Sequence, residues 1–189
     1  MRRTNLLVLL LVALVWSALS TVGCDKIKEA FLSAAAKEPV TITSDDGSAQ
    51  ITAPGNWKKR TDLHDDAMLQ AADIVGENYI VVLPDSKADL EDGMNINGHS
   101  DITRSSIMEN IKDCKQTAGP VMLTINGRPA VQYELRGVVS GVKIVYLHTT
   151  TDGNDKFYQI LAWTMPSSYQ KNKPVLESVV NSFKETGTK

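Results

Sequence analysis

Residues 130–163 read AVQYELRGVVSGVKIVYLHTTTDGNDKFYQILAW and decide the fold. In Ala130–Leu135 apolar and polar residues alternate, which is typical of a strand with one buried face. Val142–Leu147 and Phe157–Trp163 are apolar on both faces, which predicts central strands covered on both sides. Turn residues at 140–141 and 152–155 join these segments, so the sequence predicts consecutive antiparallel hairpins.

Further hairpins flank this centre. Residues 40–43 and 49–53 form one predicted pair, and residues 69–75 and 79–83 form a second. A strand over 121–125 ends at the tight-turn pair Asn126–Gly127.

Two helices complete the predicted domain. The first runs over 101–114, with Asp101 as N-cap and Cys114 on its apolar stripe; the second has Pro174 near its start and closes the chain. The predicted class is α+β, an α/β/α sandwich with a central, mainly antiparallel sheet and helices on both faces.

The N-terminus has the layout of an export signal, because Arg2 and Arg3 precede an apolar run over 6–16. Val22–Gly23–Cys24 resembles a bacterial lipobox, which implies cleavage after residue 23 and acylation of Cys24. We therefore expect a signal peptide at 1–23, a tether at 24–39 and a domain at 40–186. An uncleaved membrane helix over 6–23 is the alternative.

Both alternatives place the domain outside the cytoplasm and at a membrane, with membrane lipid as its first partner. Asp25 resembles the signal that retains lipoproteins in the inner membrane, facing the periplasm, of double-membraned bacteria. A membrane-anchored envelope protein with a further envelope protein as partner is the expected setting.

The composition excludes several classes of protein. The formal charge of −2, from 20 Lys and Arg against 22 Asp and Glu, provides no basic field for nucleic acid. Two cysteines cannot build a disulfide framework or a four-thiolate zinc site. With Cys24 acylated, Cys114 is expected to be a buried structural thiol.

No catalytic motif is present: the chain has neither a G-x-S-x-G elbow nor a glycine-rich phosphate loop. His64, His99 and Asp101 are the candidate metal ligands, but each local cluster is better explained by loop charge or helix capping. We therefore predict no metal, no cofactor and no enzyme. Tyr146 and His148 share one face of a strand and are the residues of a candidate pocket.

A basic segment over 55–60 surrounds Trp57, and it could touch anionic lipid headgroups. A solvated turn with Trp57 folded onto the core is the favoured interpretation.

Three segments resemble the PsbP-like superfamily, and their order and spacing are similar to DcrB-type bacterial envelope lipoproteins. They are Ile51–Trp57 with its Pro-x-x-Trp ending, Ile125–Ala130, and Phe157–Trp163 followed by Pro166 and the closing Val179–Phe183. The resemblance covers residues 40–185 and implies the α/β/α sandwich. It implies an accessory or assembly role and carries over no catalytic residues. A small-ligand or metal-binding module at the membrane surface is the alternative function.

Overall fold

A computed structural model describes residues 38–187. The predicted signal peptide and nearly all of the predicted tether lie outside the described residues. The elements in chain order are β1 (Val40–Thr43), β2 (Ala49–Ala53), β3 (Lys58–Lys59), β4 (Leu69–Asp73), β5 (Asn78–Ser86), the 3-10 helix η1 (Lys87–Asp89), α3 (Ile96–Asn110), β6 (Lys112–Ile125), β7 (Arg128–Val139), β8 (Val142–Asp152), β9 (Lys156–Thr164), α4 (Tyr169–Asn181) and β10 (Lys184–Glu185).

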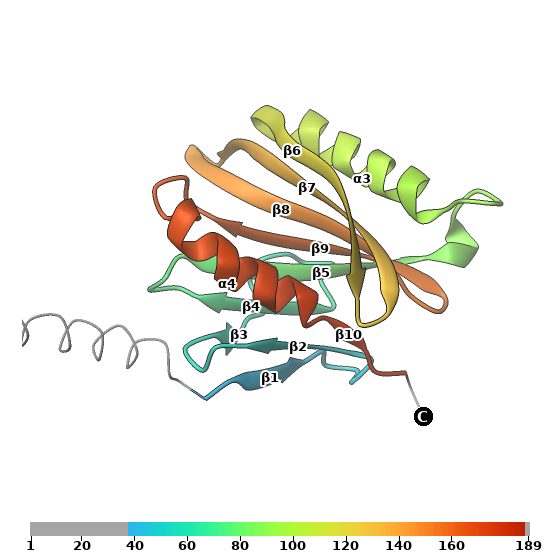
Figure 1. Cartoon of the computed structure of the whole chain (residues 1–189), viewed down its shortest axis with the longest axis horizontal. Helices are drawn as coiled ribbons and strands as arrows, with labels where there is room; N and C mark the ends of the chain where they lie inside the picture. Colours follow the sequence, from blue (N-terminus) through green and yellow to red (C-terminus); the bar gives the residue numbers. More distant parts are fainter. Residues whose placement is uncertain (1–37, 188–189) are drawn as a thin grey trace, which may run out of the picture. The chain divides into compact units, whose positions relative to one another are not determined.

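The strands form two sheets, in which every pair is antiparallel (Figure 1). The larger sheet has seven strands in the order β3-β4-β5-β9-β8-β7-β6, and the smaller has the order β1-β2-β10. The two strands predicted to be apolar on both faces, β8 and β9, lie inside the large sheet. The α+β class and the hairpin series are therefore confirmed.

Alternate residues of β8 face two different hydrophobic clusters, because successive side chains of a strand point to opposite faces. Val145 and Leu147 belong to the main core, which includes residues of α4, β2, β4, β5 and β9. Tyr146 packs instead against a smaller cluster beneath α3, formed by Val131, Tyr133 and Leu135 of β7.

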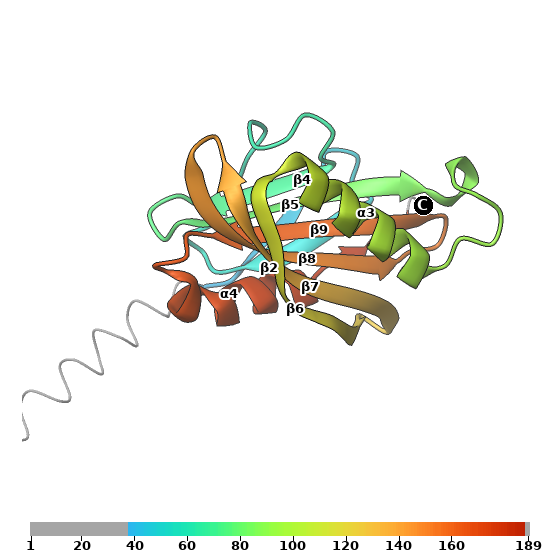
Figure 2. The ribbon, with the colours of Figure 1, turned by 90° about the horizontal axis from the view of Figure 1, so that it is seen from above.

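The two faces of the large sheet are covered by different elements. The main core is closed by α4 together with β1 and β2 of the small sheet. Helix α3 lies across strands of the large sheet (Figure 2), and its Ile96, Ile107 and Met108 pack on the smaller cluster. The finer description as an α/β/α sandwich with helices on both faces stays a prediction.

The position of the first helix was predicted wrongly. Asn95 is its N-cap, since its side-chain oxygen accepts hydrogen bonds from the backbone N–H groups of Asn97 at 3.0 Å and Gly98 at 3.1 Å. Asp101, the predicted cap, lies inside α3. The backbone becomes extended at Ile111, and Cys114 lies in β6 rather than on a helical stripe. The apolar spacing of the sequence continues through this change from helix to strand, so periodicity alone could not locate it.

Pro174 lies inside α4 and not near its start. The helix begins at Tyr169, whose ring is buried in the main core, so tertiary packing stabilises a turn N-terminal to the proline. Pro174 has no N–H for the carbonyl of Gln170, which costs the helix one hydrogen bond. Within residues 38–187, neither helix has the length and apolar character that a membrane crossing requires.

Candidate binding site

A pocket of about 360 Å³ opens on the part of the large sheet beside Tyr146. Its floor comes from three neighbouring strands, with Tyr79 and Val81 of β5, Leu161 and Trp163 of β9, and Ile144 and Tyr146 of β8. Its walls come from two loops and a strand end. The wall residues are Leu63, His64, Val139, Val142, Thr164 and Met165.

Three aromatic residues of the floor are direct neighbours across the sheet. Trp163 is in register with Tyr79 on one side and with Tyr146 on the other. The rings of Tyr79 and Trp163 stack with centroids 5.3 Å apart and planes 11° apart, and the ring of Tyr146 lies 5.6 Å from Trp163 in a tilted arrangement. Such pairs contribute about 0.5–1.5 kcal/mol beyond area burial, so the floor is preorganised.

The surroundings of Tyr146 are poorly hydrated. Burial, with a smaller contribution from the nearby Cys114 side chain, raises the pKa of its phenol to about 12. Desolvation disfavours the charged phenolate. Tyr146 therefore contributes an uncharged phenol to the lining of the pocket.

A single buried side chain holds one wall in place. The amide oxygen of Gln70 accepts hydrogen bonds from the N–H groups of Leu63 at 2.8 Å and His64 at 3.2 Å. Its amide nitrogen donates to the carbonyl of His64 at 2.6 Å. The opposite wall is the β7–β8 hairpin, whose Ser140 and Gly141 adopt the positive φ values of 50° and 84° that a tight two-residue turn requires.

The structure places only one residue of the predicted pair in this pocket. Tyr146 is on the floor, whereas His148 is completely buried beneath α3, with its Nε2 atom 3.2 Å from Thr103 Oγ1 and its ring stacked on Tyr133. Burial is the main cause that lowers the pKa of His148 to about 4, with smaller contributions from positive charge at His99 and Arg104. The two residues share a face of β8, but α3 covers one and leaves the other accessible.

The three candidate metal ligands lie apart. His64 is in the exposed pocket wall, while His99 is on α3, where its Nε2 atom lies 3.0 Å from Asp85 Oδ2 and its ring stacks on Phe157. Asp101 accepts a hydrogen bond of 2.7 Å from the hydroxyl of Tyr133. Within the described part of the chain, no group of three His, Cys, Asp or Glu side chains could hold a metal ion.

Polar side chains are buried beside the hydrophobic cluster beneath α3. His99 is 3% exposed, and Ser100 and His148 are 0% exposed. Burial would raise the pKa of Asp85, but hydrogen bonds from His99 and Gln159 outweigh it and the net shift is downward. His99 and His148 therefore have internal partners, Asp85 and Thr103, and these two contacts help to fix α3 to the sheet.

The basic segment over 55–60 is largely neutralised. Lys59 pairs with Asp45 at 2.7 Å and Arg60 with Asp62 at 2.5 Å. Trp57 is only 1% exposed and belongs to the main core, as the favoured interpretation predicted. The segment thus presents no tryptophan to a membrane.

Only one of the two cysteines lies in the described part of the chain. Cys24, the predicted lipidation residue, lies outside the described residues. Cys114 is half-buried against the cluster beneath α3, and burial raises the pKa of its thiol. A raised pKa disfavours the reactive thiolate, which agrees with a structural thiol.

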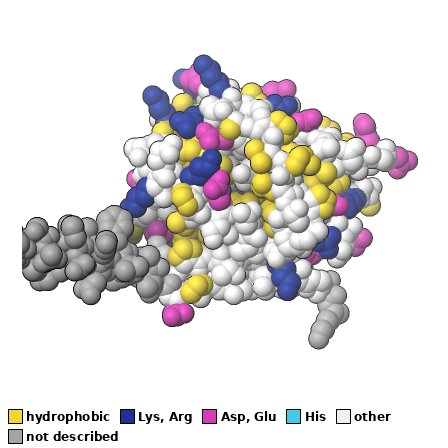
Figure 3. Space-filling view, viewed as in Figure 1, with side chains coloured by type: hydrophobic (Ala, Val, Ile, Leu, Met, Phe, Trp, Pro, Cys, Tyr) yellow, Lys and Arg dark blue, Asp and Glu magenta, His cyan; other side chains and the backbone are white. Residues whose placement is uncertain are grey.

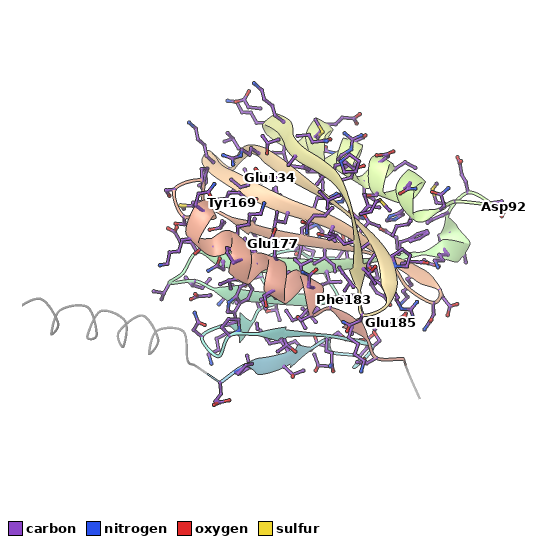
Figure 4. All side chains as sticks on the ribbon, in the orientation of Figure 1. Asp92, Glu134, Tyr169, Glu177, Phe183 and Glu185 are labelled. Atoms are coloured by element: carbon purple, nitrogen blue, oxygen red, sulfur yellow. The ribbon has the colours of Figure 1, made fainter. Side chains whose placement is uncertain are left out.

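Sequence reasoning missed a polar cluster where α4 meets β7. The carboxylate of Glu134 accepts hydrogen bonds from the hydroxyls of Tyr169 and Thr117 and from the guanidinium of Arg136, while Lys173 lies 3.8 Å away. Figure 4 shows Glu134 and Tyr169 beside the first turn of α4, and Figure 3 shows charged side chains of both signs next to one another on this side. The alternation of β7 placed Glu134 on the α4 face, but no local signal identified its partners.

No protein-family model and no curated protein sequence matches this chain. Several solved structures are similar to this chain. One is cyanobacterial PsbP (CyanoP) from Synechocystis sp. PCC 6803, with 12% identity, a TM-score of 0.58 and coverage of 79% of this chain and 94% of that chain. Another is LpqN, involved in cell envelope biogenesis of Mycobacterium tuberculosis, with 11% identity, a TM-score of 0.55 and coverage of 79% and 91%.

A third is PA94 from Pseudomonas aeruginosa, a protein of unknown function and putative regulator, with 10% identity, a TM-score of 0.52 and coverage of 79% and 99%. The predicted PsbP-like fold is therefore confirmed. The finer assignment to the DcrB type stays a prediction.

Proposed function

We propose that this protein is a lipid-anchored, extracytoplasmic accessory protein of the cell envelope that acts by binding and not by catalysis. The observation that carries the proposal is the PsbP-like fold, which is shared with a protein involved in envelope biogenesis. The N-terminal export pattern and the lipobox-like Val22–Gly23–Cys24 support it independently.

The buried groups of the domain support a non-catalytic role. A catalytic acid, base or nucleophile must reach its substrate within hydrogen-bond distance. His99, Ser100 and His148 carry the chemistry that a hydrolase would need, yet all three are enclosed beneath α3. The accessible hollow beside Tyr146 is instead mostly apolar and is lined by no Asp, Glu, Lys or Arg.

The anchor is tested by comparing two cysteine variants of the full chain in a bacterial host. We expect Cys24→Ser to abolish incorporation of a radiolabelled fatty acid and to release the protein from the membrane fraction, because stable anchoring takes at least two acyl chains. Cys114→Ser is the matched control and should keep both the label and membrane retention.

Retention of the Cys24→Ser protein in the membrane would refute the lipid anchor and favour an uncleaved helix over 6–23. Orientation is tested separately with a membrane-impermeant amine reagent, applied before and after the inner membrane is broken. Labelling of the domain lysines only after the inner membrane is broken would contradict an extracytoplasmic location.

A further inference from the structure

The pocket beside Tyr146 is lined without a single Asp, Glu, Lys or Arg side chain. The lining residues with polar side-chain atoms are His64, Thr164, Tyr79, Tyr146 and Trp163. An ionised group that moves from water into such surroundings loses its hydration and finds no partner of opposite charge. The pocket therefore discriminates against charged ligands and favours uncharged ones.

The mouth of the pocket is also apolar. Val139, Val142 and Met165 are 37%, 44% and 36% exposed, and all three line the pocket. Their exposed carbon atoms extend the apolar surface of the floor outward on the β7–β8 hairpin and at the end of β9. Covering these side chains with a ligand would remove apolar surface from water, which favours binding.

The size and preorganisation of the pocket fit a small molecule. Its volume of about 360 Å³ falls within the range of about 300–1,000 Å³ that is usual for small-molecule sites. The floor residues stand on three paired strands and one wall is fixed by Gln70, so little ordering is needed on binding.

We infer that this pocket is a binding site for an uncharged hydrophobic small molecule, with an apolar body in contact with Trp163 and Tyr146. The inference names a ligand class for the domain and does not depend on the lipid anchor.

The test is photoaffinity labelling of the full-length chain in phosphatidylcholine vesicles with a diazirine-bearing decanol, followed by mass spectrometric mapping of the labelled residues. We expect the label to concentrate on residues that line the pocket and to be displaced by excess decanol. A diazirine-bearing decanoate has a similar chain but carries a negative charge, and it should label the pocket at least about tenfold less.

Two matched pairs of variants locate the site. Val142→Trp places an indole at the mouth and should reduce pocket labelling at least about fivefold. Val121→Trp is its control, because Val121 is a similarly exposed strand residue (48%) that does not line the pocket. Val142→Lys adds a cation and should raise labelling by decanoate relative to decanol, whereas Val121→Lys should not.

Circular dichroism spectra that match the wild type establish that each variant is folded. The inference is wrong if the label is spread over exposed apolar residues such as Val121 and Met122, or if excess decanol does not displace it. Equal labelling by decanol and decanoate, or equal labelling of Val142→Trp and the wild type, would also overturn it. None of these results bears on the anchor, which the Cys24→Ser comparison tests.

Discussion

His148 makes the stability of this domain depend on pH in a way that can be measured. Burial lowers its pKa from 6.5 to about 4 in the folded state. The folded protein thus keeps His148 neutral at a pH at which the unfolded chain has already bound a proton. Stability from this residue is complete above about pH 6.5 and is lost as the pH falls towards 4.

The size of the loss follows from the width of that window. Each pH unit between the unfolded and folded pKa values lowers the free energy of unfolding by about 1.4 kcal/mol. Lowering the pH from about 7.5 to about 4.5 should therefore reduce it by about 2–3 kcal/mol. The structure supplies the physical reason, since a proton added to Nδ1 of His148 would be buried without a hydrogen-bond partner. The charges of His99 and Arg104 oppose the same proton.

Urea unfolding followed by circular dichroism, repeated across this pH range, measures the effect. We expect His148→Gln to lose about 2–3 kcal/mol less stability on acidification than the wild type, whatever its stability at neutral pH. His64→Gln removes a histidine from an exposed loop and should follow the wild-type curve. Carboxylates that titrate near pH 4 contribute equally to all three proteins. Parallel curves for His148→Gln and the wild type would show that protonation of His148 does not destabilise the fold.

Three further predictions concern packing, backbone conformation and a half-buried ion pair, and urea unfolding checks each. Leu176→Ala removes a fully buried core side chain of α4 and should cost about 2–5 kcal/mol; a cost below 1 kcal/mol would contradict the core assignment. Gly119→Ala places a Cβ atom 2.6 Å from a backbone carbonyl oxygen of β7 at a φ of +93°, and should cost more than Gly127→Ala, which meets nothing within 4 Å at a φ of +81°. Gly127→Ala should cost about 1–2 kcal/mol, and equal costs for both would be the contrary result. Arg128→Met removes the 2.9 Å ion pair with Glu185, whose side chain is 11% exposed, and should cost about 1–3 kcal/mol, part of which Glu185→Gln in the same chain should restore.

The strand pattern could be predicted from the sequence because it depends on local alternation and on turn residues. Val145 and Leu147 alternate with Tyr146 as a two-faced central strand requires, and Asn126–Gly127 marks a real turn. The start of α3 could not be placed in the same way. Asn95 and Asp101 are both good capping residues, and only the contacts of Ile96 with the sheet select the earlier one.

The pocket was predicted only in part, for a physical reason. Tyr146 and His148 share a face of β8, and periodicity can establish that much. Which of them is covered depends on where α3 crosses the sheet, and that position is set by packing over residues distant in sequence. The neighbours of Tyr146 across the sheet, Trp163 and Tyr79, become predictable only when the strand order is known.

We propose that the PsbP-like domain is held at the envelope by a lipid on Cys24. The most direct test is the intact mass of the protein extracted from membranes, together with the sequence of its first residue. We expect a chain that begins at Cys24 and carries covalent acyl groups on that residue. A chain that retains residues 1–23, or one that begins at Cys24 without added lipid, would contradict it.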